Sequence, residues 1–149
     1  MNQNEVLKLN DQVIEAWNQH NAEKFLSLCD ENVIWKINGG TETYSGKKEV
    51  RDYFESWNTA FPDLRLNIRT KTALEDEVIA EFEFSGTQKG PLHFRDDMPD
   101  IPAKNLAVHN FGCYISKLRN GKIRETNLYV DQFALVEQLG IGNDIMHHA

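Results

Sequence analysis

The sequence predicts an α+β domain in which helices pack on one side of a curved antiparallel sheet. Three observations lead to this prediction. Apolar residues recur at helical spacing through most of residues 5–61. From residue 64 to 130 they alternate with polar residues, as in half-buried antiparallel strands. Between two of these segments lies Asn120-Gly121, a dipeptide that favours a tight hairpin turn because both residues tolerate positive φ.

Three helices and one strand are expected in the first part of the chain. Apolar spacing predicts a helix over 5–20, and Asn21 can cap a second, short helix. Alternation predicts a strand over 31–37. A third helix ends before Pro62 and carries one broad apolar stripe, made of Val50, Tyr53, Phe54, Trp57 and Phe61.

The remainder of the chain is expected to be mostly strand. The predicted strands cover residues 64–72, 78–84, 105–118 and 122–130. A short amphipathic helix follows and ends at Gly140. The order ααβαββββα predicts a single domain over residues 1–149, with the helices gathered on one face of the sheet.

Composition narrows the classes of partner. The 149 residues are 40% hydrophobic, and no run of 18 apolar residues is present, so no membrane span is expected. A net charge of −7 argues against binding to nucleic acid or to an anionic membrane surface. Cys29 and Cys113 are far apart and have no metal-ligand spacing, which predicts free, mostly buried thiols in a reducing cytoplasm. No secretion signal is expected at the start.

A long loop over residues 85–104 separates two of the predicted strands. It contains three acids, Asp96, Asp97 and Asp100. Carboxylates in a loop can bind a metal ion, but we favour a solvated acidic loop because no His or Glu at ligand spacing accompanies them. No metal and no cofactor is therefore expected.

The last strand ends in an acid. Its alternate residues share one face, and they are Ile123, Glu125, Asn127, Tyr129 and Asp131. Asp is a preferred N-cap, so Asp131 can simply begin the final helix. If this face lines a cavity, the same carboxylate can act as an acid or base. The two roles are compatible.

Short motifs in the same order resemble those of the SnoaL-like polyketide cyclases, also called predicted ester cyclases, of the nuclear-transport-factor-two-like superfamily. The motifs span nearly the whole chain: Asp30 with Val33-Ile34-Trp35, Gly46, Phe61-Pro62-Asp63-Leu64-Arg65, Gly86-Thr87-Gln88-Lys89-Gly90, Ile101-Pro102-Ala103, Asn120-Gly121-Lys122-Ile123, Glu125, Asp131 and Gln138-Leu139-Gly140. After Ile101-Pro102-Ala103 the family commonly has Thr-Gly, whereas this chain has Lys104-Asn105. Asn tolerates the left-handed backbone, so the turn can be kept, but a lysine at the pocket rim would alter how substrate is held.

The resemblance implies a cone, in which a strongly bent sheet and its helices enclose one deep pocket (a cystatin-like α+β barrel). It also implies that Asp131 is the catalytic acid/base of a cofactor-independent intramolecular aldol cyclisation of a polyketide ester. We expect Asp131 at the bottom of an apolar funnel, where desolvation makes it a stronger base. Homodimers that pair through the outer sheet face, with Ile79 and Leu128 in the interface, are also implied.

The candidate substrate-binding residues are mainly aromatic: Trp17, Trp35, Tyr53, Trp57, His109, Asn127 and Tyr129. Flat side chains suit a hydrophobic or polycyclic ligand, although core packing explains the tryptophans and Tyr53 equally well. His109 on an apolar face is more typical of a core histidine. Asn127 could donate to an enolate oxygen or simply bond within the sheet.

Two other function classes stay open. One is a hydrolase or dehydratase of the same fold, but neither an Asp-Arg-Asp set nor a His pair with Asp can be assigned. The other is a non-catalytic protein that binds a small hydrophobic ligand. A solvent-exposed Asp131 outside any pocket would favour this last interpretation.

Overall fold

The computed structural model describes residues 1–94 and 96–142. It contains four helices and six strands in these ranges: α1 (Gln3–Asn18), α2 (Ala22–Ser27), β1 (Cys29–Ile37), β2 (Glu42–Ser45), α3 (Gly46–Ala60), β3 (Arg65–Leu74), β4 (Glu77–Thr87), β5 (Ala107–Arg119), β6 (Lys122–Val130) and α4 (Gln132–Leu139). The α+β class and the short final helix are confirmed. The four-residue strand β2 was not predicted, and the element order is therefore ααββαββββα.

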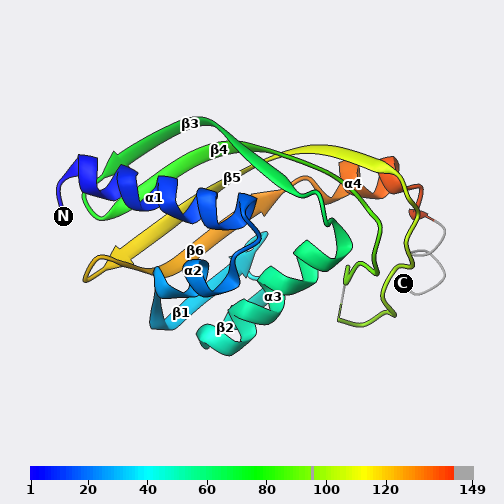
Figure 1. The fold of residues 1–149 in the computed structure, drawn as a ribbon, viewed down its shortest axis with the longest axis horizontal. Helices are drawn as coiled ribbons and strands as arrows, with labels where there is room; N and C mark the ends of the chain where they lie inside the picture. Colours follow the sequence, from blue (N-terminus) through cyan, green and yellow to red (C-terminus); the bar gives the residue numbers. More distant parts are fainter. Residues whose placement is uncertain (95, 143–149) are drawn as a thin grey trace.

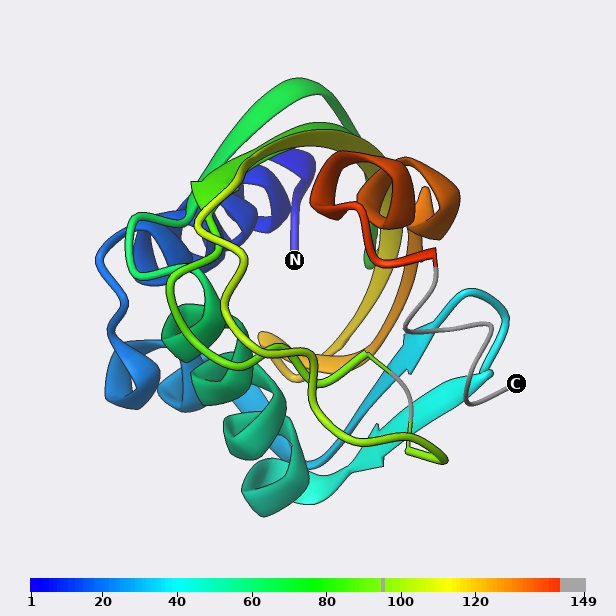
Figure 2. The ribbon, with the colours of Figure 1, turned by 90° about the vertical axis from the view of Figure 1, so that its right-hand side faces the viewer.

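All six strands form one curved sheet in the order β2-β1-β6-β5-β4-β3. The sheet is strongly bent, and the helices α1, α2 and α3 lie along its concave side (Figures 1 and 2). It is not closed, because β2 and β3 are unpaired edges. The expectation of a wholly antiparallel sheet is wrong at one place, since β1 runs parallel to β6. This pair joins strands from the two ends of the chain, so no local pattern could reveal it.

Irregularities in strand pairing accompany the curvature. The β3–β4 register shifts between Ile68 and Thr70. In the β5–β6 hairpin, Lys117 pairs with Glu125 but Leu118 pairs with Ile123, so β6 carries one extra residue, Arg124. Such bulges bend a strand and raise its twist. The Arg124 bulge also exchanges the two faces of β6, which decides the position of several candidate site residues.

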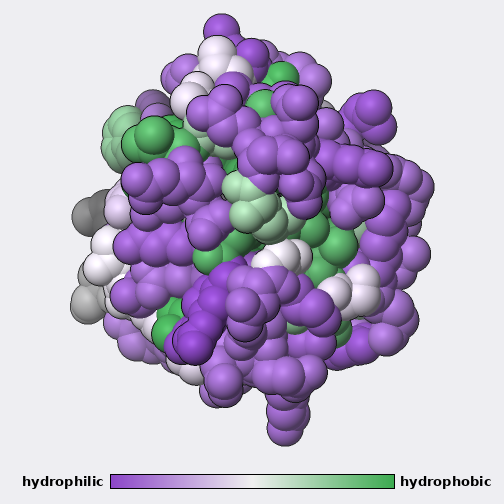
Figure 3. Space-filling model, turned by 90° about the vertical axis from the view of Figure 1, so that its left-hand side faces the viewer, coloured by the Kyte–Doolittle hydropathy of each residue, from purple (hydrophilic) through white to green (hydrophobic). Residues whose placement is uncertain are grey.

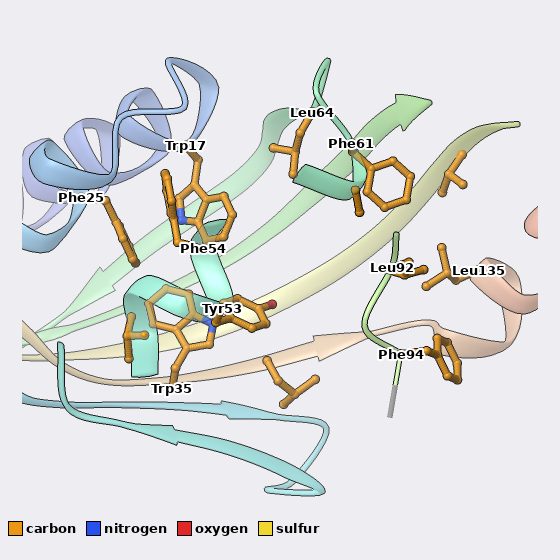
Figure 4. Packing of buried hydrophobic residues seen from close by; sticks show 14 of the residues in the cluster. Trp17, Phe25, Trp35, Tyr53, Phe54, Phe61, Leu64, Leu92, Phe94 and Leu135 are labelled. Atoms are coloured by element: carbon orange, nitrogen blue, oxygen red, sulfur yellow. The ribbon is translucent and has the colours of Figure 1, made fainter. Parts of the chain in front are cut away.

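The helices and the concave side of the sheet enclose an aromatic core (Figure 4). The Trp17 and Phe54 rings lie 4.4 Å apart, and Phe25 stacks on Phe54 at 4.8 Å. Phe25 also meets Trp35 edge-on at 5.5 Å. Since Trp17 belongs to α1, Trp35 to β1 and Phe54 to α3, these contacts tie the first three helices to the sheet.

The local signals read from the sequence behave as expected at the turns and caps. Asn120 and Gly121 both have positive φ, 52° and 75°, and they form the β5–β6 turn. Asn105 is left-handed at φ 57°, so the turn after Lys104 is kept without glycine. Asn21 caps α2 by accepting from the Lys24 backbone N–H at 3.0 Å.

The two cysteines differ in environment. Both are free, but Cys29 is buried whereas Cys113 is exposed, so the expectation of mostly buried thiols is wrong for Cys113. Burial raises the pKa of the Cys29 thiol to about 12, which keeps it protonated and unreactive. The cytoplasmic location expected from the cysteines stays a prediction.

The segment between β4 and β5 is folded against the core. Leu92 and Ile101 exchange two backbone hydrogen bonds of 2.9 and 2.8 Å, and both side chains are buried. The fully buried Gln88 side chain fixes both ends of the segment, because its amide donates to the carbonyls of Gly90, Ile101 and Pro102 and accepts from the Lys104 N–H. The hydrogen bonds of one buried side chain therefore hold the two ends of this segment together.

Candidate functional site

A cavity of about 100 Å³ lies between the helices and the concave side of the sheet. Helices α1, α3 and α4 and strands β1, β3, β4, β5 and β6 contribute to its wall, which is mostly apolar and aromatic. At the end of the molecule that carries the β3–β4 and β5–β6 turns, apolar side chains are visible in a recess between hydrophilic ones (Figure 3). The structure therefore contains an apolar cavity inside the curved sheet, and the binding of a small molecule there stays a prediction.

Four of the predicted aromatic residues line this cavity together: Trp17, Trp35, Tyr53 and Trp57. They also pack on one another and on core rings, with Trp57 stacked on Phe61 at 5.6 Å. Core packing and cavity lining are therefore both true of them. Burial raises the pKa of Tyr53, and the nearby Glu42 carboxylate adds to this effect, so Tyr53 stays neutral. Among the described residues, the buried Trp35 Nε1 has no hydrogen-bond partner.

Asp131 lies at one end of the cavity, directly before α4. It is the N-cap of that helix, and its Oδ1 accepts from the Ala134 backbone N–H at 3.0 Å. It also lines the cavity, so the cap and the cavity position occur together. The expectation that it lies at the bottom of an apolar funnel is wrong, since the residue is exposed. The reason is that β6 ends at Val130 and the chain turns there to begin the helix.

Asn110 is the polar neighbour that the sequence reasoning missed. This buried β5 residue lines the cavity, and its Nδ2 donates to the backbone carbonyl of Asp131 at 3.0 Å. Its Oδ1 accepts from the Phe111 N–H. Asn110 thus fixes the backbone from which the Asp131 carboxylate projects. The signal was available, because Asn110 has the same parity as the buried Val108, Tyr114 and Ser116.

The other three predicted site residues are not brought to the cavity. The described lining contains Leu128 and Val130 of β6 but neither Asn127 nor Tyr129, which alternate with them. The Arg124 bulge explains this, because the buried Ile123 before it and the buried Thr126 after it share a face although their parity differs. Asn127 and Tyr129 are therefore on the convex face.

Each of these outer residues has its own surroundings. Asn127 Nδ2 donates to Glu125 Oε2 at 2.9 Å, which is the sheet-surface bond considered as its alternative role. This bond, assisted by the charges of Lys36 and Lys117, lowers the pKa of Glu125. His109 is exposed, lies 3.3 Å from Glu83 and packs edge-on against Phe111, so it is not a core histidine. Tyr129 is 40% exposed.

The acidic segment contains a histidine that the sequence reasoning overlooked. His93 Nε2 lies 2.6 Å from Asp96 Oδ1, and its Nδ1 lies 3.2 Å from Asp100 Oδ1. Within residues 1–94 and 96–142, no group of three or more His, Cys, Asp or Glu side chains is arranged to hold a metal ion. Asp96 and Asp100 thus bind a side chain of their own segment.

No described helix is both long and apolar enough to cross a membrane.

The chain was compared with known proteins and solved structures. No protein of curated function matches it. A Pseudomonas putida protein classed as a polyketide cyclase is 26% identical, with a TM-score of 0.74 over 89% of this chain and 96% of that one. A Catenulispora acidiphila protein with a ketosteroid isomerase-like fold, in complex with trimethylamine, is 14% identical, with a TM-score of 0.73 over 91% and 95%.

TerC, co-crystallised with polyporic acid, is 14% identical, with a TM-score of 0.72 over 91% of this chain and 98% of that one. The sequence profile of the SnoaL-like polyketide cyclases matches residues 8–139. Since this match covers most of the 149 residues, the chain belongs to the SnoaL-like polyketide cyclase family.

Proposed function

We propose that the protein is a cofactor-independent enzyme that binds an uncharged, mostly apolar small molecule in its cavity and uses Asp131 as acid and base. The single observation that carries the proposal is the position of this carboxylate, which lies at one end of an apolar cavity on a backbone fixed by Asn110. Polyporic acid bound to TerC, a protein of the same fold, supports a small organic ligand.

The chemistry is an intramolecular aldol closure, of the kind that would cyclise a polyketide ester. The second oxygen of the Asp131 carboxylate, Oδ2, removes a proton from a carbon beside an ester or ketone. The resulting enolate carbon bonds to a second carbonyl carbon of the same molecule, and Asp131 returns the proton to the new alkoxide. No atom is gained or lost, so the product is an isomer of the substrate.

The surroundings of Asp131 set a requirement on the substrate. The carboxylate is exposed, and its Oδ1 accepts a backbone N–H. A lone carboxylate is a weak base, so it suffices only where two carbonyls activate the carbon acid and the cavity fixes the reactive conformer. An engineered cavity of about 150 Å³ holds one benzene, so the 100 Å³ here encloses only part of a polycyclic ligand.

The decisive experiment follows exchange of the activated hydrogen for deuterium. Uncharged β-keto esters in D₂O are monitored by NMR with the wild type and with Asp131→Asn. Asn caps helices as well as Asp does, so the fold should be kept, whereas catalysed exchange should fall by about 10²–10⁴-fold. Asp76→Asn, the same change in the β3–β4 turn, is the matched control. Equal exchange rates in the wild type and Asp131→Asn would remove Asp131 from the mechanism.

Two alternative functions can be compared with this proposal. Tight binding of these esters without exchange would favour a non-catalytic binding protein. A hydrolase using Asp-Arg-Asp or a dehydratase using His with Asp has less support, since the described cavity lining contains neither Arg nor His.

The proposed assembly is a homodimer that pairs through convex sheet faces. Ile79 and Tyr129 are 43% and 40% exposed there, on strands β4 and β6. Leu128 lines the cavity, so the expectation that it joins the interface is wrong. Size-exclusion chromatography with light scattering should give twice the chain mass of 17.2 kDa. The mass of a single chain at working concentration would contradict the dimer.

A further inference from the structure

One hydroxyl in the cavity wall makes no hydrogen bond with a described residue. The hydroxyls that line the cavity within residues 1–94 and 96–142 are those of Tyr53, Tyr114 and Ser116. Tyr114 donates to Asn10 Oδ1, and Ser116 Oγ lies 2.8 Å from Thr126 Oγ1. Tyr53 Oη has no such partner in the described part of the chain, although the residue is only 7% exposed. A buried hydroxyl without a partner costs stability, and a ligand that accepts from it removes this cost.

The Tyr53 oxygen is buried but can still be reached from the cavity. The sealed side-chain N and O atoms that lack a partner among the described residues are Asn10 Nδ2, Trp35 Nε1 and Asn58 Oδ1. Tyr53 Oη also lacks a partner but is not sealed, so it retains accessible surface, and Tyr53 lines the cavity. Figure 4 shows this oxygen pointing away from Phe25 and toward the side of the core where Leu135, another residue of the cavity wall, lies.

Four aromatic rings hold the Tyr53 side chain in place. The centroid of its ring lies 6.2 Å from that of Trp17, 6.2 Å from that of Trp35, 4.9 Å from that of Tyr44 and 6.4 Å from that of Trp57. These neighbours belong to α1, β1, β2 and α3. A side chain that is already fixed loses little conformational freedom when a ligand binds. The hydroxyl is therefore preorganised.

The Tyr53 hydroxyl is available as a donor. Burial raises the pKa of Tyr53, and the charge of Glu42 adds to this effect, so the hydroxyl keeps its hydrogen. The Glu42 carboxylate is itself occupied, because Tyr44 donates to its Oε2 at 2.5 Å. The indole N–H of Trp35 acts on the pKa of Tyr53 in the opposite direction, which places it on the side of the phenol oxygen, but Trp35 Nε1 does not reach hydrogen-bond geometry with that oxygen. The hydrogen of the Tyr53 hydroxyl is therefore left for a ligand.

Charge and hydrogen-bonding capacity define the kind of acceptor. Asp131 is the one Asp or Glu in the described lining, which contains no Lys, Arg or His. A carboxylate or phosphate would find no cation there, and burying such a charge unpaired is costly. A ligand hydroxyl would bring a further donor into an apolar cavity, whereas a carbonyl oxygen only accepts. A carbonyl oxygen therefore fits the Tyr53 donor best.

We propose that the Tyr53 hydroxyl donates a hydrogen bond to an uncharged carbonyl oxygen of the ligand, and that this bond selects ketones and esters over hydrocarbons of the same shape. Tyr53 is then a specificity-determining residue, separate from the acid/base Asp131. That this ligand is also the molecule deprotonated by Asp131 rests on the proposed function. The bond to a carbonyl oxygen can be tested without catalysis.

A first test needs no ligand. Tyr53→Phe removes only an oxygen that has no partner in the described chain, so the variant should melt at the wild-type temperature or above it. Tyr114→Phe removes the same atom from the same cavity wall but breaks the bond to Asn10, and it should melt about 3 °C or more below the wild type. If both variants lose the same amount, Tyr53 is bonded within the protein and the proposal is overturned.

A second test compares 1-indanone with indane, two uncharged bicyclic probes that differ by one carbonyl oxygen. Dissociation constants are measured by NMR titration. Tyr53→Phe should bind 1-indanone about fivefold more weakly than the wild type does, and its affinity for indane should change less than about twofold. Tyr129→Phe, the same change on the convex face, is the matched control and should bind both probes as the wild type does. Equal changes for both probes in Tyr53→Phe, or binding of neither probe by the wild type, would overturn the proposal.

The carbonyl band of bound 1-indanone reports the bond directly. A hydrogen bond weakens the C=O bond, so isotope-edited infrared spectra should show a lower stretching frequency with the wild type than with Tyr53→Phe. The same frequency in both would count against the bond. Asp131→Asn should leave the band unchanged, so a loss of deuterium exchange in that variant bears on the proposed function alone.

Discussion

The two faces of strands β5 and β6 carry similar polar residues, but those on one face are buried and those on the other are exposed. On the concave face, Asn110, Tyr114 and Ser116 line a cavity and are nearly inaccessible to solvent. On the convex face, His109 pairs with Glu83 and is open to solvent. Residue type therefore does not separate a site residue from a surface residue here. The direction of the side chain does, and the register of the strand sets it.

The faces also differ in how far their hydrogen bonds are completed. On the convex face, Asn127 donates to Glu125, which also pairs with Lys36 at 3.7 Å. On the concave side, the buried Asn10 Nδ2 and Trp35 Nε1 have no partner among the described residues. Bonds formed in water stabilise little, whereas a buried donor without an acceptor costs free energy. The convex face is therefore solvated and fully paired at these residues, and the concave side is buried and less completely paired.

The largest expected difference is in stability, between one aromatic residue on each face. Phe82→Ala removes a ring that is 6% exposed, lines the cavity and lies 5.9 Å from the Tyr114 ring. It should lower the free energy of unfolding by about 3–5 kcal/mol. Tyr129→Ala, on the convex face, should cost about 1 kcal/mol or less. Urea unfolding at a concentration with one assembly state measures both, and equal losses would contradict the distinction between the faces.

A smaller effect on stability is expected at Gly112 of β5, where the backbones of β5 and β6 approach closely. A Cβ there would lie 2.7 Å from the Tyr129 backbone oxygen and 2.8 Å from the Phe82 ring. Because the carbonyl belongs to a paired strand and cannot turn aside, Gly112→Ala should cost about 1–3 kcal/mol. Gly142→Ala, which meets nothing within 4 Å, is the matched control. If the melting temperatures of the two variants agree, β5 and β6 are less closely packed than the structure indicates.

The smallest effect concerns pH and the segment that packs against the concave-side core. Burial opposes charge on His93, but the hydrogen bonds that it donates to Asp96 and Asp100, with the charge of Glu42, raise its pKa. A histidine with a raised folded-state pKa gives its full stabilisation below its unfolded value of about 6.5. That contribution is lost as the pH rises through the folded-state pKa.

The free energy of unfolding should therefore fall slightly from pH 6 to pH 8.5 in the wild type. Tyr44, whose pKa burial raises, stays neutral in this window. His93→Gln should remove that part of the slope, which urea unfolding at four pH values would measure. The same slope in the variant and the wild type would show that the pairing of His93 with Asp96 and Asp100 does not contribute.

Local signals predicted much of the fold. Asn120-Gly121 specified its hairpin because the conformation depends on the two residues themselves. The helices and the long strands were found because their apolar periods repeat over many residues. The edge strand β2 was missed because four residues are too few to show a period, and its pairing with β1 depends on the turn between them.

The candidate site was predicted only in part. The aromatic residues were found because large rings near the N-terminal helices must be buried somewhere. Asn127 and Tyr129 were placed in the pocket by simple alternation, which fails at the Arg124 bulge. Asn110 was missed because the opposite face of β5 was assigned to the pocket.

By itself the sequence determined the class of fold, the family and the identity of the acid at the end of β6, because these depend on composition, period and short motifs. Only the tertiary structure decided that β1 runs parallel to β6, that Asp131 is exposed and that Asn10 meets Tyr114. Asn10 and Tyr114 are 104 residues apart in the chain. No periodicity reaches so far, and such a contact exists only once the sheet has curved and α1 has packed against it.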